Sequence, residues 1–185
     1  MAKTRLAIIG AGGHAKAGHY RDPGLRHCPE EIELCAACDL DRDKLAAVAD
    51  EFGVPAVYTD FREMIAEAKP DGIVIVLPPT LVAEMARACL ELGQHVIVEK
   101  PPGCNLTEAQ SILDTAVACE RKVAVSVDRR FFPVTQLLKR KLVPSKINHL
   151  NMSYNKAFFS WGAPTNLFTA DAIHLIDLFL YLGGP

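Results

Sequence analysis

The feature that most constrains the fold is a glycine-rich run near the start of the chain. An apolar segment covers residues 5–9, and the run that follows it is Gly10-Ala11-Gly12-Gly13-His14-Ala15. This order predicts a buried strand, a tight turn and the beginning of a helix. Gly10, Gly12 and Ala15 match the pattern G-x-G-x-x-G/A. In that pattern the first glycine permits the turn, the second lets a phosphate approach the backbone, and the small third residue allows close packing.

Strand-like and helix-like segments alternate as far as about residue 127, which predicts an α/β fold with a doubly wound parallel sheet. Several strand-like segments are continuously apolar, as in residues 72–77, which is typical of parallel strands covered on both faces. Amphipathic helical patterns lie between them. Residues 1–127 are therefore predicted to form a Rossmann domain that binds a dinucleotide. We expect strands near residues 4–10, 32–38, 55–58, 72–77, 95–99 and 122–127.

The pattern changes after residue 128, and residues 128–185 are predicted to begin a second, incomplete α+β domain. A helix is expected from Arg130, a half-buried strand at about 147–155, and a last, nearly all-apolar and therefore buried helix at about 170–182. A single strand is unstable without partners. We therefore expect that the rest of its sheet is missing from this chain or that another protomer supplies it, which predicts a homo-oligomer.

Composition narrows the classes of partner. The chain has 185 residues, of which 50% are hydrophobic, and a formal net charge of −2. Nucleic acid and anionic membranes are disfavoured as partners because no basic block is present. No apolar run reaches the roughly 20 residues that span a bilayer. The first residues do not resemble a signal peptide, so a cytoplasmic location is expected.

The six cysteines are scattered and are expected to be reduced thiols, as in most cytosolic proteins. Cys35 and Cys38 have CxxC spacing but lie in a strand-like segment. Residues three apart in a regular strand face opposite sides, so this pair is not expected to chelate a metal. The histidines show no ligand spacing such as HExxH. No metal site is therefore expected.

Asp39, at the end of the second predicted strand, indicates the type of dinucleotide. A carboxylate at this position can accept hydrogen bonds from both ribose hydroxyls and would repel a 2′-phosphate. The sequence therefore predicts NAD rather than NADP, although Arg42, three residues later, keeps NADP open. His14 lies inside the glycine run and either contacts the cofactor or faces solvent.

Lys100 follows the apolar segment at residues 95–98 and precedes two prolines. Ligands of open α/β sheets bind at the carboxyl ends of the strands, and prolines restrict the backbone locally. A partly desolvated lysine has a lowered pKa and can exchange a proton near neutrality. Lys100 is thus a candidate acid/base residue, with a surface lysine as the plain alternative.

The last predicted helix carries three polar residues, Asp171, His174 and Asp177, spaced three apart. At 100° per residue this spacing produces one slowly drifting stripe. Buried polar groups need partners. The stripe therefore lines a cleft, with His174 facing a substrate hydroxyl, or it forms a structural network.

Together these motifs resemble the Gfo/Idh/MocA family of NAD(P)-dependent oxidoreductases. The resemblance implies hydride transfer between a nicotinamide ring and a small sugar-like or polyol-like substrate, on a Rossmann domain followed by a domain with a large open sheet. It places Leu77, Pro78 and Glu99, with Gly13 and His14 of the glycine run, at the cofactor. The matching pieces are residues 8–13, 37–39, 77–79, 95–101, 130–133 and 174–183.

The family roles carried over are specific. Lys100 would polarise or protonate the reacting oxygen beside the nicotinamide, His174 would assist as acid/base or orient the substrate, and Asp171 would support His174. The chain departs from the family where a threonine and a histidine are common, at Leu77 and Val82, and it ends well before the family's second domain does. The favoured hypothesis is an NAD-dependent oxidoreductase. The alternative is a non-catalytic, NAD(H)-binding truncated member, or a gene fragment.

Overall fold

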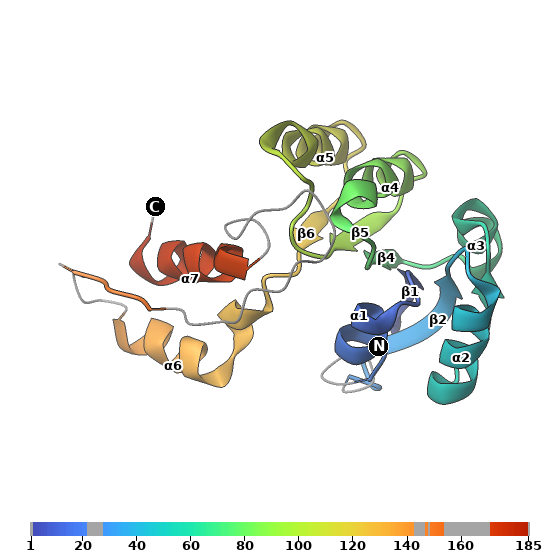
Figure 1. Ribbon diagram of the computed structural model, residues 1–185, viewed down its shortest axis with the longest axis horizontal. Helices are drawn as coiled ribbons and strands as arrows, with labels where there is room; N and C mark the ends of the chain where they lie inside the picture. The colour runs from blue at the N-terminus through green and yellow to red at the C-terminus, as the bar shows by residue number, and fades with distance from the viewer. Residues whose placement is uncertain (1, 22–27, 143–146, 148, 154–170, 185) are drawn as a thin grey trace.

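The computed structural model describes residues 2–21, 28–142, 147, 149–153 and 171–184 (Figure 1). Its centre is a six-stranded, fully parallel sheet with the order β3-β2-β1-β4-β5-β6. The order reverses at β1 and β4, which is the switch point where such sheets bind ligands. The predicted α/β fold is confirmed. The strands are β1 Thr4–Ile9, β2 Ile32–Cys38, β3 Val57–Tyr58, β4 Gly72–Ile75, β5 His95–Val98 and β6 Val123–Val125.

Helices cover the two faces of the sheet unequally. The larger buried cluster joins one face to α3 (Phe61–Ala68), α4 (Pro79–Glu91) and α5 (Leu106–Ala118). The smaller cluster packs Tyr20 and α2 (Arg42–Phe52) on the other face, over β1, β2 and β4. Among the described residues, neither cluster covers the second face of β5, and Ile97 on it is exposed. The expectation that strands are buried on both faces therefore holds for the centre of the sheet but not for β5.

Local sequence signals set the helix ends. The Asp41 carboxylate accepts hydrogen bonds from the amides of Asp43 (3.1 Å) and Lys44 (3.2 Å) at the start of α2. These bonds satisfy two of the amides that a helix leaves unpaired at its N-terminus. Gly53 ends the same helix with a φ of 67°, a left-handed conformation that glycine adopts without strain.

A β-bulge changes the expected placement of the two cysteines of β2. Leu34 pairs with Leu6, and Ala36 pairs with the next residue, Ala7, so Cys35 is an extra residue between two pairs. The bulge breaks the strict alternation of side chains. As a result, Cys35 and Cys38 belong to the same buried cluster rather than to opposite faces. Both are free thiols, and burial raises the pKa of each, that of Cys38 to about 12.

After the sheet, the part of the chain that the structure describes includes η3 (Asp128–Phe131), α6 (Pro133–Leu142) and α7 (Ile173–Gly183). Helices α6 and α7 contact each other beside the sheet (Figure 1). The α-helix expected from Arg130 begins instead at Pro133, because proline suits the first helical position. In the expected strand at 147–155, residues 149–153 alternate between exposed and partly buried but form no strand, and Tyr154 lies outside the described residues.

Helix α7 is less buried than its composition predicts. Ile176, Phe179 and Leu180 are between 44% and 51% exposed, although the sequence predicts burial all round. The described elements that pack on α7 are η3 and α6, and these do not cover the outer side of the helix. Among the described helices, none is both long and apolar enough to cross a bilayer.

Candidate functional site

The glycine loop follows β1 and leads into a short α1 (Gly13–Ala15) and a π-helix, η1 (Lys16–Arg21). A Cβ atom placed on Gly12 or Gly13 would have no other atom within 4 Å, so the outer side of the loop is open. Ala15, in contrast, is buried against the sheet. This is the arrangement in which loop amides can approach a pyrophosphate.

Asp39 is bound to the glycine loop. Its Oδ2 accepts a hydrogen bond from the amide of Ala11 (2.7 Å), and its Oδ1 accepts one from the amide of Asp41 (3.0 Å). Each carboxylate oxygen can accept a second hydrogen bond, so the contacts with the loop leave acceptor capacity for ribose hydroxyls. Arg42 is exposed beside this position.

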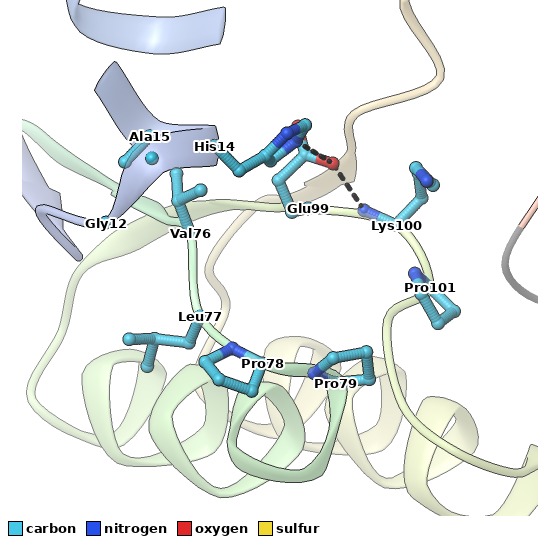
Figure 2. Close-up of a pocket in the computed structure, with 11 residues that line it drawn as sticks. Gly12, His14, Ala15, Val76, Leu77, Pro78, Pro79, Glu99, Lys100 and Pro101 are labelled. Atoms are coloured by element: carbon cyan, nitrogen blue, oxygen red, sulfur yellow. Dashed lines mark hydrogen bonds and ion pairs between the residues drawn. The ribbon is translucent and has the colours of Figure 1, made fainter. Parts of the chain in front are cut away.

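A cavity of about 280 Å³ lies between the glycine loop and the carboxyl ends of β4 and β5. Figure 2 shows Leu77, Pro78 and Pro79 on one side of it and His14 and Glu99 on the other. The structure thus brings most predicted cofactor residues together. Gly10 and Asp39 do not line the cavity and lie behind the loop. The predicted residues lining it are Gly12, Gly13, His14, Ala15, Leu77, Pro78, Glu99 and Lys100.

Glu99 supplies a carboxylate to this cavity and is held by three contacts. Its Oε1 lies 2.8 Å from His19 Nε2 and its Oε2 lies 3.6 Å from His14 Nε2, while Oε2 also accepts a hydrogen bond from the Lys100 amide (3.0 Å). Burial alone would raise the pKa of Glu99. The two histidines outweigh burial and lower this pKa well below its usual range. Glu99 is therefore ionised at neutral pH.

His14 lies 3.6 Å from Glu99 Oε2 and its side chain is 58% exposed, so it lines the cavity and also faces solvent. His19 is a site residue that sequence reasoning missed. Its spacing from His14 is five residues, which matches no ligand or pair spacing on an α-helix. The π-helical winding of η1 was not expected from the sequence. Because a π-helix closes i→i+5 hydrogen bonds, this winding lets residues five apart lie on the same side.

Lys100 and His174 line a second cavity, of about 400 Å³, which also contacts His14, His19 and Glu99. His174 is 8% exposed, and its Nδ1 lies 3.8 Å from Asp128 Oδ1 without a hydrogen-bond partner in the described part of the chain. Burial lowers the pKa of His174, and the positive charges of Arg129 and Lys100 lower it further. His174 is therefore mainly neutral at pH 7, and in this form it can accept a proton.

The polar stripe of the last helix does not act as one unit. Asp171 is buried but lines neither cavity. Asp177 accepts hydrogen bonds from Arg130 Nε at 2.8 and 2.7 Å, and a further one from Arg130 Nη2. The expectation of a stripe lining a cleft is thus met at His174 alone, whereas Asp177 follows the structural alternative.

The comparison with protein families identifies the domain. A family model described as an oxidoreductase family with an NAD-binding Rossmann fold matches residues 4–128, which is more than half of the chain. The chain belongs to the Gfo/Idh/MocA family. The match ends at residue 128, where η3 begins, so the family assignment rests on the sheet with its glycine loop.

Two curated relatives match almost the whole chain. The D-glucoside 3-dehydrogenase of Escherichia coli is 29% identical over 97% of this chain and 54% of its own length. The 4-carboxy-2-hydroxymuconate-6-semialdehyde dehydrogenase of a Sphingobium species is 27% identical over 97% of this chain and 59% of its own length. The chain therefore spans little more than half the length of these relatives.

Among solved structures, the WlbA dehydrogenase of Bordetella pertussis, crystallised with NADH and UDP-GlcNAcA, superimposes with a TM-score of 0.83 at 20% identity. The superposition covers 100% of this chain and 59% of that protein. At this identity the likeness shows the shared fold.

Proposed function

We propose that this chain carries the cofactor-binding half of a dehydrogenase that uses NAD, with the beginning of its substrate site. The observation that carries the proposal is that Lys100 lines both cavities. It stands between the glycine loop on one side and His174 on the other. A nicotinamide ring in the first cavity and a substrate in the second would meet at this lysine.

The reaction that fits is oxidation of a secondary alcohol or reduction of the ketone. In oxidation, a hydride leaves the carbinol carbon for the nicotinamide ring while the hydroxyl proton passes to the amine of Lys100. In reduction, the hydride moves to the carbonyl carbon and the Lys100 ammonium protonates the oxygen. His174, mainly neutral and buried, would hold the neighbouring hydroxyl or relay the proton.

The substrate class proposed is a sugar-like or polyol-like alcohol. The name of the E. coli relative supports this class, whereas that of the Sphingobium relative points to a different one. The lining of the second cavity also supports it, because Ser126, Asp128 and His174 offer hydrogen-bonding groups to hydroxyls. The preference for NAD over NADP is proposed from the position of Asp39 at the end of β2.

The test has two steps on the full chain. In the first step, the fluorescence of NADH measures its binding. In the second step, sugars and polyols are screened as substrates for turnover. Lys100→Ala is expected to abolish turnover and leave NADH affinity within about threefold. Lys3→Ala changes an exposed lysine just before β1, at the end of that strand opposite the glycine loop, and is expected to change neither NADH affinity nor turnover. Equal loss of binding and turnover in Lys100→Ala would contradict the assigned role.

The second candidate is an NAD(H)-binding module without turnover. This second candidate is favoured by the exposed apolar side of α7. Because α7 carries His174, which lines the second cavity, that wall of the cavity is only partly supported by packing. NADH binding with no turnover on any screened alcohol would favour this candidate. Absence of NADH and NADPH binding would contradict both.

A further inference from the structure

Three side chains converge on one point in the wall between the two cavities. The Glu99 carboxylate lies 2.8 Å from His19 Nε2 and 3.6 Å from His14 Nε2. The ligand atoms of the three residues all lie within 4.8 Å of one another. With metal–ligand bonds of 2.0–2.1 Å, neighbouring ligand atoms lie about 3.3 Å apart in a tetrahedral site and about 3 Å apart where the ligands are at right angles. The separations of 2.8 Å, to Glu99 Oε1, and 3.6 Å, to Glu99 Oε2, lie on either side of these values.

The helix geometry explains how these residues meet. On an α-helix, residues five apart are rotated by about 140° from each other at 100° per residue. His14 lies in α1 and His19 in the π-helix η1. The π-helix closes i→i+5 hydrogen bonds, so residues five apart lie on one side of it. The expectation of no metal site assumed α-helical spacing, and the π-turn removes that assumption.

The chemistry of the cluster suits a cation. The Glu99 side chain is only 10% exposed and the His19 side chain 16% exposed, so both are held at fixed positions in the wall. Two imidazoles and a carboxylate form a ligand set used for divalent transition metals. His14 is 58% exposed, so one side of the cluster is accessible to an incoming ion.

The surrounding charges also permit a cation. All three residues line the second cavity, whose other charged residues are Lys100 and Asp128. With neutral histidines, the lining carries two carboxylates and one ammonium group, which leaves it net negative. Three protein ligands would leave at least one coordination position for water or a ligand oxygen.

We propose that His14, His19 and Glu99 bind a divalent transition-metal ion of the kind that prefers nitrogen and oxygen ligands, such as Ni²⁺ or Zn²⁺. The site is separate from the proposed role of Lys100 and does not depend on it. His14 and Glu99 also line the first cavity, so an ion bound there would alter dinucleotide affinity.

The test uses Ni²⁺ and the full chain in isothermal titration calorimetry. Ni²⁺ is chosen because imidazole suits it, whereas Zn²⁺ is also bound readily by thiolates. One ion per chain is expected. His14→Gln and Glu99→Gln should each weaken Ni²⁺ binding by at least about tenfold, the lower limit seen even when an outer-shell partner of a metal site is lost. His149→Gln, an exposed histidine outside the cluster, should leave binding unchanged.

A folding control separates loss of a ligand from loss of structure. Circular dichroism of each metal-free variant should match the unchanged protein, and His14→Gln is the decisive variant because its exposed side chain makes misfolding improbable. No Ni²⁺ binding in the unchanged chain, a loss of less than tenfold in His14→Gln, or an equal loss in His149→Gln would each overturn the proposal.

Discussion

Gly10 faces the backbone of Val76 so closely that no side chain fits between them. A Cβ atom on Gly10 would lie 2.1 Å from the carbonyl oxygen of Val76, and the φ of Gly10 is 115°. The contact lies where β1 and β4 end side by side, next to the hydrogen bond from the Val76 amide to Ile9 (2.8 Å). The first glycine of the loop is therefore required for the fold, whereas Gly12 faces open space.

Gly10→Ala and Gly12→Ala form a matched pair: the first is expected to lower stability and the second to weaken NADH binding. Gly10→Ala should lower the free energy of unfolding by at least about 2 kcal/mol, because of its left-handed φ and the clash with Val76. Gly12 has a φ of −72°, which alanine adopts readily. Gly12→Ala should keep its stability but weaken NADH binding by about tenfold or more, since the methyl group blocks approach of the phosphate. Urea unfolding and NADH fluorescence measure the two effects, and a destabilised Gly12→Ala with normal binding would refute the distinction.

Asp39 should control the choice of dinucleotide. Asp39→Ser removes the negative charge that would repel a 2′-phosphate, so the ratio of NADPH to NADH affinity is expected to rise by about tenfold. The ratio is the informative quantity, because loss of the hydrogen bonds to Ala11 and Asp41 should weaken both affinities alike. Asp50→Ser, on the exposed side of α2, serves as the control. An unchanged ratio in Asp39→Ser would exclude this role.

His174 should make the fold less stable in mild acid. Its pKa is lowered in the folded state, first by burial and then by Arg129 and Lys100, against the opposing effects of Asp128 and Glu99. The unfolded chain, with an ordinary histidine pKa of about 6.5, therefore binds the proton more strongly. Stability due to His174 is full above about pH 6.5 and declines as pH falls below it, by at most about 1.4 kcal/mol per pH unit.

This pH dependence is measured by urea unfolding between pH 7.5 and 5. His174→Gln keeps a polar side chain and should show a shallower loss of stability over that range than the unchanged protein. His149→Gln should retain the original slope because His149 is exposed. Parallel curves for the unchanged protein and His174→Gln would show that the folded state does not disfavour the charged imidazole.

Arg130 and Asp177 should stabilise the packing of η3 on α7. Asp177→Asn removes the negative charge from this ion pair and is expected to lower the free energy of unfolding by about 1–2 kcal/mol. The loss should be smaller than for a fully buried pair, because the Arg130 side chain is 38% exposed. Arg140→Ala, at an exposed position of α6, should cost little. A double-mutant cycle with Arg130→Gln measures the coupling, and a coupling energy near zero would show that the pair is not stabilising.

The sequence by itself was enough to predict the six strands, their parallel arrangement and the glycine loop. These features depend on local patterns: continuous apolar segments, helical periodicity, and glycines at a strand end. Asp39, Glu99 and Lys100 could be placed at one edge of the sheet for the same reason, because the carboxyl ends of parallel strands meet there.

Only the tertiary structure decided the features that depend on packing between distant elements. The bulge at Cys35 put both thiols of β2 in one cluster, and the π-turn brought His19 to Glu99 across 80 residues of sequence. The polar residues of the last helix have different surroundings. His174 lines a cavity, whereas Asp177 accepts a hydrogen bond from Arg130. Periodicity shows which face of an element is polar or apolar, but the partner opposite that face is set by the arrangement of the whole chain.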